Sequence, residues 1–135
     1  MKNILKLSIC LLILTINCAY SQARIGNSIK DIKDEFKDPV YKLTSGINNY
    51  GIDYISVETE RASIVYYFND ENICYITIIV PDNQGAINYY VELYNNQYVI
   101  VSSTEWKMYS KKGIAKIKLK FGDDDICFFL WEFEE

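Results

Sequence analysis

The chain of 135 residues contains no histidine. This absence excludes Ser–His and Cys–His nucleophile pairs, histidine metal ligands and the usual general base at neutral pH. The six glycines are scattered and form no phosphate-binding loop. The sequence therefore predicts a protein that is not an enzyme and that uses no cofactor or metal ion.

Cysteine is also scarce, and two of the four cysteines lie close to the N-terminus. The remaining pair, Cys74 and Cys127, is too small for a four-sulfur zinc site. An even number of cysteines in an exported domain favours a disulfide, so we predict a bond between Cys74 and Cys127. Two buried free thiols are the alternative, because cysteine is among the most buried residue types.

The N-terminus has the features of a secretory signal. Two lysines precede an apolar run over residues 7–16, which is too short to span a bilayer. Ala19 and Ser21 place small residues where a signal peptidase requires them. We therefore predict that residues 1–21 are a signal peptide and that the protein is exported, to the periplasm or the medium, without stable membrane insertion after processing. Lipidation at Cys18 and an uncleaved anchor are the alternatives.

Residues 22–135 have the length of a single domain. Cleavage would remove two lysines and no acid, which changes the net charge from −4 to −6. An acidic chain of this kind argues against nucleic acid and against an anionic membrane surface as the partner. The expected partner is another protein, and a second copy of the chain is the alternative.

Hydrophobic periodicity predicts two helices. Ser28 is a good N-cap for a helix over residues 28–37, and a second helix is predicted over 81–95. Residues 40–52 contain turn-forming types and are predicted to be a loop. Six strands are predicted at residues 54–59, 62–68, 73–80, 98–103, 114–121 and 126–133, with the fourth open to extension through 106–109.

A nine-residue pattern occurs twice, 53 positions apart, at residues 68–76 and 121–129. It predicts a helix-three-strand unit used twice, with pseudo-repeats at about 25–80 and 81–134. The predicted fold class is α+β, with an antiparallel sheet of about six strands and two helices on one face. A local two-fold axis between the repeats would bring the two equivalent cysteines together. Convergence of two acidic hairpins is the alternative.

The strand over residues 114–121 alternates lysines with apolar residues. If the next loop is even-numbered, Leu119 pairs with Phe128, whereas an odd-numbered loop swaps the faces. Because the last strand of each half is apolar on both faces, the second face is either covered by residues 40–52 or is an exposed protein-binding surface. The candidate partner-binding face comprises Tyr67, Ile76, Ile78, Phe129, Trp131 and Phe133.

Clustered charges allow further interpretations. Glu58 and Glu60 are predicted to lie on the same face of a strand. They could be a pair of hydrolytic carboxylates or part of a solvated strand edge. The acidic turns around Asp70 and Asp124 could hold calcium or be ordinary hairpin tips. The lysine row of residues 114–121 could attract an acidic partner or protect a sheet edge from strand addition. The twelve tyrosines suit both interfaces and strands.

Residues 25–32, IGNSIKDI, followed by an antiparallel meander, resemble the opening of small exported bacterial α+β proteins of unknown function. The chain also resembles two-repeat β-lactamase-inhibitor-like proteins and small lipoproteins of outer-membrane assembly. The inhibitor-like resemblance implies a tandem repeat that binds a protein through its sheet. The expected function is an exported, non-catalytic protein-binding or inhibitor-like module, with a small-ligand-binding envelope protein or a structural homodimer as alternatives.

Overall fold

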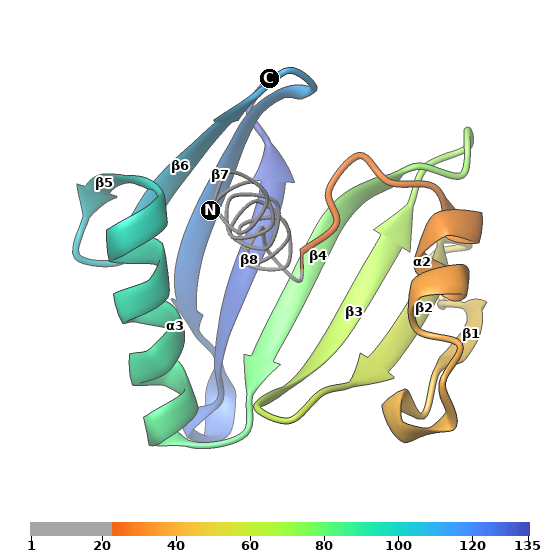
Figure 1. The fold of residues 1–135 in the computed structure, drawn as a ribbon, viewed down its shortest axis with the longest axis horizontal. Coiled ribbons are helices and arrows are strands. Elements are labelled where there is room, and N and C mark those ends of the chain that lie inside the picture. The colour runs from red at the N-terminus through yellow and green to blue at the C-terminus, as the bar shows by residue number, and fades with distance from the viewer. Residues whose placement is uncertain (1–22) are drawn as a thin grey trace, which may run out of the picture.

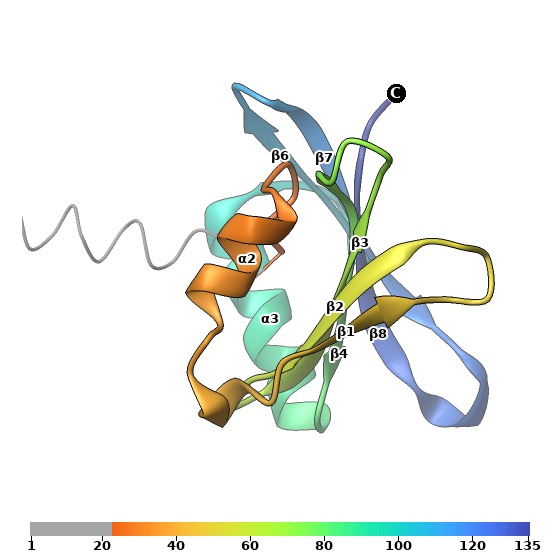
Figure 2. The same ribbon diagram turned by 90° about the vertical axis from the view of Figure 1, so that its right-hand side faces the viewer.

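The computed structural model describes residues 23–135, and the predicted signal peptide lies outside this range. The helices are α2 (Ile29–Glu35) and α3 (Gln84–Gln97), with the short 3-10 helices η1 (Pro39–Tyr41) and η2 (Asp123–Asp125). The strands are β1 (Thr44–Ile47), β2 (Asp53–Glu58), β3 (Ala62–Phe68), β4 (Cys74–Pro81), β5 (Val99–Ser102), β6 (Glu105–Ser110), β7 (Gly113–Phe121) and β8 (Cys127–Phe133). They form one antiparallel sheet in the order β1-β2-β3-β4-β8-β7-β6-β5. Both α-helices lie on the same face of this sheet (Figures 1 and 2).

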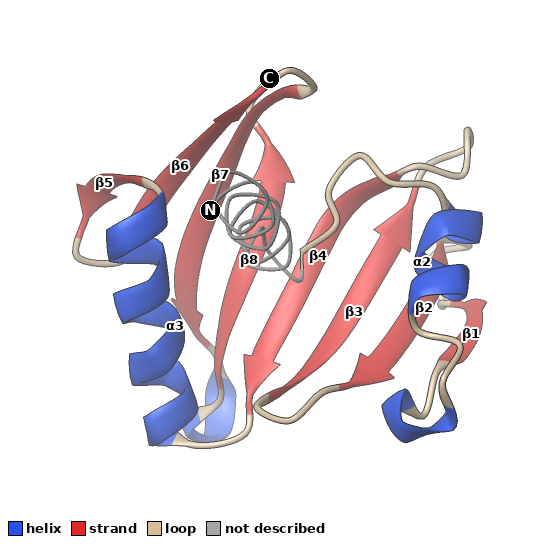
Figure 3. Cartoon of the chain, viewed as in Figure 1, coloured by secondary structure: helices blue, strands red, loops and turns tan. Residues whose placement is uncertain are grey.

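The prediction of six strands in two helix-three-strand units is wrong, because the sheet has eight strands. β1 lies within the segment predicted to be a loop, and the fourth predicted strand is divided into β5 and β6. The sequence of β1 is Thr-Ser-Gly-Ile, in which the glycine disfavours a strand, and its pairing with β2 decides its conformation. Each half of the described chain therefore has one α-helix followed by four strands, and the strand order is symmetric about the β4–β8 pair (Figure 3).

Local capping sets the start of both helices. The Ser28 hydroxyl accepts a hydrogen bond from the Asp31 amide at 3.2 Å, and the Asn83 side chain accepts one from the Ala86 amide at 2.9 Å. The second helix therefore begins later than predicted, because Pro81 is the last residue of β4. Both caps leave their residues in extended backbone, which turns the chain from the sheet into the helix.

The segment before α2 crosses the helix-bearing face of the sheet (Figure 1). The Gly26 amide donates to the Cys74 carbonyl and the Cys74 amide donates to the Asn27 carbonyl, both at 2.8 Å. The buried Thr77 hydroxyl donates to the carbonyl of Ala23, a residue with no exposed surface. These bonds satisfy polar groups that would otherwise be buried without partners, and they make this segment part of the core.

An aromatic cluster joins α3 to the sheet. The Tyr94 ring meets Trp106, Phe129 and Trp131 edge-on, with centroid separations of 5.6, 5.1 and 5.5 Å. The two indoles are also anchored by hydrogen bonds, because Trp131 Nε1 donates to the Tyr94 hydroxyl at 3.3 Å and Trp106 Nε1 donates to Asn95 at 2.8 Å. Edge-to-face packing adds to the stabilisation that burial of such large rings provides.

The β7–β8 hairpin takes the odd-numbered register. Leu119 pairs with Phe129, so the even-numbered pairing of Leu119 with Phe128 is wrong. Asp124 and Asp125 both have a φ near +60°, a left-handed conformation that Asp adopts more readily than most residues. This turn fits five residues between Phe121 and Cys127, which directs Phe129 into the core under α3.

Two phenylalanines of this hairpin allow a matched test of the core. Phe129 has no exposed surface, whereas Phe121 is 70% exposed. We expect Phe129→Ala to lower the free energy of unfolding by about 3–5 kcal/mol, because truncation leaves a cavity beneath Tyr94. Phe121→Ala should change it by less than about 0.5 kcal/mol. Urea unfolding followed by circular dichroism measures both, and equal losses would contradict this assignment of the core.

Candidate partner-binding face

The sheet face opposite the helices has no described helix over it (Figure 2). Residues 40–52 lie at the β1 edge of the sheet, where they form part of η1, the strand β1 and the turn to β2. Side chains on a strand alternate between faces, so the residues between the buried positions point to this second face. We call this surface, formed by the outward residues of β2, β3, β4, β8, β7 and β6, the open face.

The strand register arranges the open face in rows that cross the sheet. A central row runs through Ser56, Val65, Ile78, Leu130, Lys118 and Glu105. A second row runs through Tyr54, Tyr67, Ile76, Glu132, Lys116 and Lys107. The alternation of side chains along the strands adds a third set of residues to the same face. These are Glu58 and Ser63 on β2 and β3, Val80 and Phe128 on β4 and β8, and Lys120 on β7.

The middle of the open face is an apolar stripe. It is contributed by β3, β4 and β8, and its side chains are half-buried. The apolar stripe comprises Val65, Tyr67, Ile76, Ile78, Val80, Phe128 and Leu130. A stripe of this composition beside charged residues has the anatomy of a protein–protein interface, with an apolar centre and a polar rim.

Lysines of β6 and β7 form one rim of the stripe. Lys107 donates a hydrogen bond to Glu134 at 2.9 Å, which raises the pKa of Lys107 and lowers that of Glu134. Within residues 23–135, no carboxylate lies within 4.0 Å of the ammonium groups of Lys116, Lys118 or Lys120. These three lysines therefore form no salt bridge within residues 23–135, and the neighbours of Lys116 and Lys118 on the adjacent strands are Glu132 and Glu105.

The opposite rim contains no lysine or arginine. Tyr54 lies there beside Tyr67 of the stripe, with ring centroids 6.5 Å apart. The Tyr54 ring also passes over Gly46 of β1, where a Cβ would come within 3.1 Å of the phenol oxygen. The Glu58 carboxylate accepts a hydrogen bond from the Ser63 hydroxyl at 2.8 Å. Aromatic and hydrogen-bonding groups thus stand opposite the lysines across the stripe.

The structure divides the six residues predicted to form one binding face. Tyr67, Ile76 and Ile78 lie on the open face, while Phe129 and Trp131 are fully buried under α3. Phe133 is half-buried and points to the helix side with them. The six residues therefore do not form one surface. The residues of β8 among them lie on the helix side of the sheet, because the observed hairpin register differs from the even-numbered one.

Residues that the sequence analysis did not select complete the open face. Phe128 and Leu130 replace Phe129 and Trp131 on β8, and Val65 and Val80 extend the stripe on β3 and β4. The signal that identifies them is the acidic turn before β8, whose Asp residues tolerate the left-handed conformation that an odd-numbered loop needs. That turn decides which of two alternating sets faces outward.

The two cysteines are unbonded, so the predicted Cys74–Cys127 disulfide is wrong for this fold. The register of β4 with β8 places Cys127 beside Pro81, which lies seven residues along β4 from Cys74. At the rise of a strand this is about 23 Å, whereas a disulfide needs Cα atoms within about 7 Å. Burial raises the pKa of the Cys74 thiol to about 11, which keeps it protonated at neutral pH.

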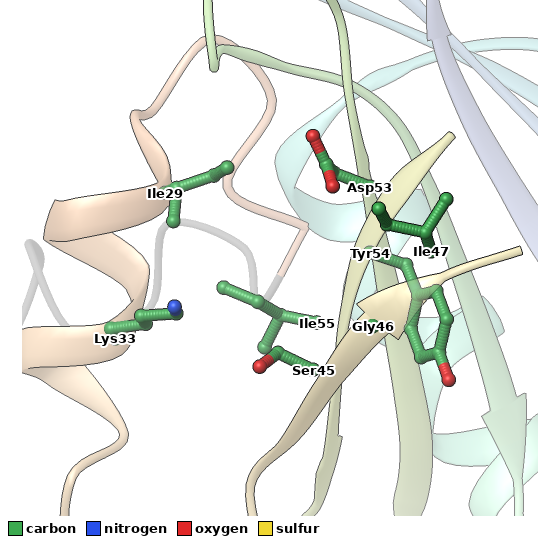
Figure 4. A pocket seen from close by; sticks show the side chains of 8 residues that line it. All are labelled: Ile29, Lys33, Ser45, Gly46, Ile47, Asp53, Tyr54 and Ile55. Carbon is green, nitrogen blue, oxygen red and sulfur yellow. The ribbon is translucent and has the colours of Figure 1, made fainter. Parts of the chain in front are cut away.

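The described residues also line several cavities. One of about 220 Å³ lies between α2 and the β1–β2 edge, where Ile29 and Lys33 project towards Ile55 (Figure 4). This is less than the roughly 300 Å³ at which small-molecule sites usually begin. A cavity of about 480 Å³ beside Arg24 and Lys112 and one of about 450 Å³ beside α2 are larger. In the first of these, Arg24 pairs with Glu35 and Lys112 bonds to Asn27 at 3.1 Å.

Among residues 23–135, no group of three or more Cys, Asp or Glu side chains is placed to hold a metal ion. Neither α2 nor α3, the α-helices of that range, has the length and apolar character needed to cross a membrane. The chain matches no protein-family model, no curated protein and no solved structure. Function is therefore inferred from the geometry.

The different environments of the two thiols can be tested by labelling. Cys127 is partly exposed at the start of β8, whereas Cys74 has no exposed surface and a raised pKa. In the native protein at pH 8 we expect a maleimide to label Cys127 and to leave Cys74 unlabelled. In denaturant without reductant, both cysteines should be labelled. Mass spectrometry of the peptides shows which cysteine carries each label. Labels that appear only after reduction would show that a disulfide is present after all.

Proposed function

We propose that this is an exported, non-catalytic protein-binding module that binds its partner through the open face. The observation that carries the proposal is the apolar stripe on the central strands, bordered on one side by the lysines of β7, which have no carboxylate within 4.0 Å in the described chain. Apolar surface that is left uncovered on a sheet gains free energy when a complementary surface covers it.

The composition of the open face favours a protein partner. Tyrosine and aliphatic side chains dominate its centre, as in protein interfaces, and tyrosine provides large contact area at low entropic cost. The chain as a whole is acidic, with a net charge of −4, which disfavours nucleic acid and anionic membrane surfaces. The lysine rim is local, so it orients a partner rather than attracting polyanions to the whole molecule.

The environment of the buried titratable groups supports a non-catalytic function. Burial raises the pKa of Tyr94 well above its usual value and that of Tyr90 to about 12. Both phenols pack inside the aromatic cluster under α3, so they serve as neutral core residues at physiological pH. On the open face, Glu132 pairs across the strands with Lys116 instead of with a second carboxylate. Nucleophilic or paired-acid catalysis has no support in this arrangement.

Site-specific photocrosslinking in the native host tests this proposal. Replacing Tyr67 on the open face by p-benzoylphenylalanine should produce a covalent adduct on irradiation, because Tyr67 belongs to the apolar stripe. The matched position is Tyr89 on α3, which is 42% exposed on the helix side. It should produce no adduct, or a much weaker one. The adducts would be identified by mass spectrometry.

A second variant shows whether the stripe itself binds. Ile78→Lys places a charge at the centre of the open face, where desolvation on binding would be costly, and should abolish crosslinking from position 67. Circular dichroism checks that this variant is folded. Adducts from Tyr89 with none from Tyr67, or adducts that persist in Ile78→Lys, would reject the open face as the binding surface.

A further inference from the structure

Charge is distributed unequally over the two halves of the open face. The β2–β3 half contributes Tyr54, Ser56, Glu58, Ser63, Val65 and Tyr67 and has no cation. The β7–β6 half contributes all four lysines of the open face, Lys107, Lys116, Lys118 and Lys120. The strand order is nevertheless symmetric about β4–β8, so each lysine-bearing strand has a lysine-free counterpart at the same distance from the centre.

This asymmetry determines which self-association is electrostatically allowed. If two open faces meet about a two-fold axis parallel to the strands, β7 of one copy covers β3 of the other. If the axis runs across the strands, the lysines of β7 face the lysines of the second β7. The second arrangement brings like charges together and is unfavourable, whereas the first places every lysine over a cation-free half.

The rows of the two copies then meet in register. The central row places Ile78 over Leu130 of the second copy, and Val65 over the aliphatic stem of its Lys118. The neighbouring row places Tyr67 over Lys116 of the second copy, so the ammonium can approach an aromatic face. Each contact occurs twice because of the two-fold axis.

We propose that the partner that covers the open face is a second copy of this chain, packed face to face about an axis parallel to the central strands. This inference rests on the proposed function, because it identifies the partner of the same surface. Six strands with about six residues each give a face of roughly 580 Å² per copy at normal strand spacings. The total of about 1,160 Å² lies at the lower limit of specific interfaces, where weak and transient association is typical.

A new lysine on the cation-free half of the open face, alone and together with a glutamate on the lysine-bearing half, tests the proposed arrangement of the two copies. In Val65→Lys, the new lysine lies over Lys118 of the second copy in both contacts, so the dissociation constant should rise by about ten-fold or more. Adding Lys118→Glu to the same chain should restore it to near the wild-type value. Positions 65 and 118 are three strand spacings apart within one chain, about 14 Å, so restoration requires contact between two copies.

Sedimentation of the purified protein over a micromolar concentration series measures these constants. Lys30→Glu on α2 makes the same charge change as Lys118→Glu, but on the helix face, and should leave the dimer unchanged. Circular dichroism and urea unfolding confirm that each variant is folded. The expected result is a wild-type dimer, a weakened Val65→Lys protein and a restored double variant.

Other outcomes overturn the inference in distinguishable ways. A strictly monomeric wild type that still crosslinks a different protein from position 67 overturns the second copy as partner and leaves the proposed function standing. A monomer without any adduct from position 67 overturns both. A dimer that is unaffected by Val65→Lys but lost in Ile100→Pro would place the contact at the apolar β5 edge, where Ile100 is 56% exposed, and not on the open face.

Discussion

The structure depends on the antiparallel pairing of β4 with β8. These strands come from different halves of the chain, and the pairing of Ile76–Ile79 with residues 129–132 is the central seam of the sheet. Without it each half would be a four-stranded sheet with one α-helix, a bare strand edge and half of an aromatic core. The seam brings Trp131 beside Thr77, so the cluster under α3 and the segment that begins at Ala23 share one core.

The same seam creates the open face. β4 and β8 each contribute a short apolar row, and only their adjacency joins Ile78 to Leu130 in a continuous stripe. The two α-helices and the segment before α2 all lie on the other side, so neither of these helices covers this stripe (Figure 2). The lysines of β7 lie one strand away from the stripe, and their counterparts on β3 are uncharged. The scaffold is therefore symmetric in its strands and asymmetric in its charge.

The repeated sequence pattern was informative about elements and misleading about faces. Both copies form a hairpin with a five-residue turn, pairing Phe68 with Cys74 and Phe121 with Cys127. In the first copy a register shift between Tyr67 and Phe68 directs Ile76 to the open face, whereas the second copy has none and Phe129 stays in the core. One extra residue in a strand inverts every side chain beyond it. Equivalent positions of the repeat therefore lie on opposite faces of the sheet.

Much of the local structure could be predicted from the sequence, because caps, periodicity and turn residues act over a few positions. Ser28 does start the first helix, and the alternation of β7 does place Ile117 inside and Lys118 outside. The sequence also established the absence of histidine and the acidic charge, which limit the chemistry. Only the tertiary structure decided that β1 is a strand, that the two cysteines lie far apart, and which residues of β8 face outward. Each of these outcomes depends on hydrogen bonds between strands distant in sequence, and a shift of one residue in such a pairing exchanges core for surface.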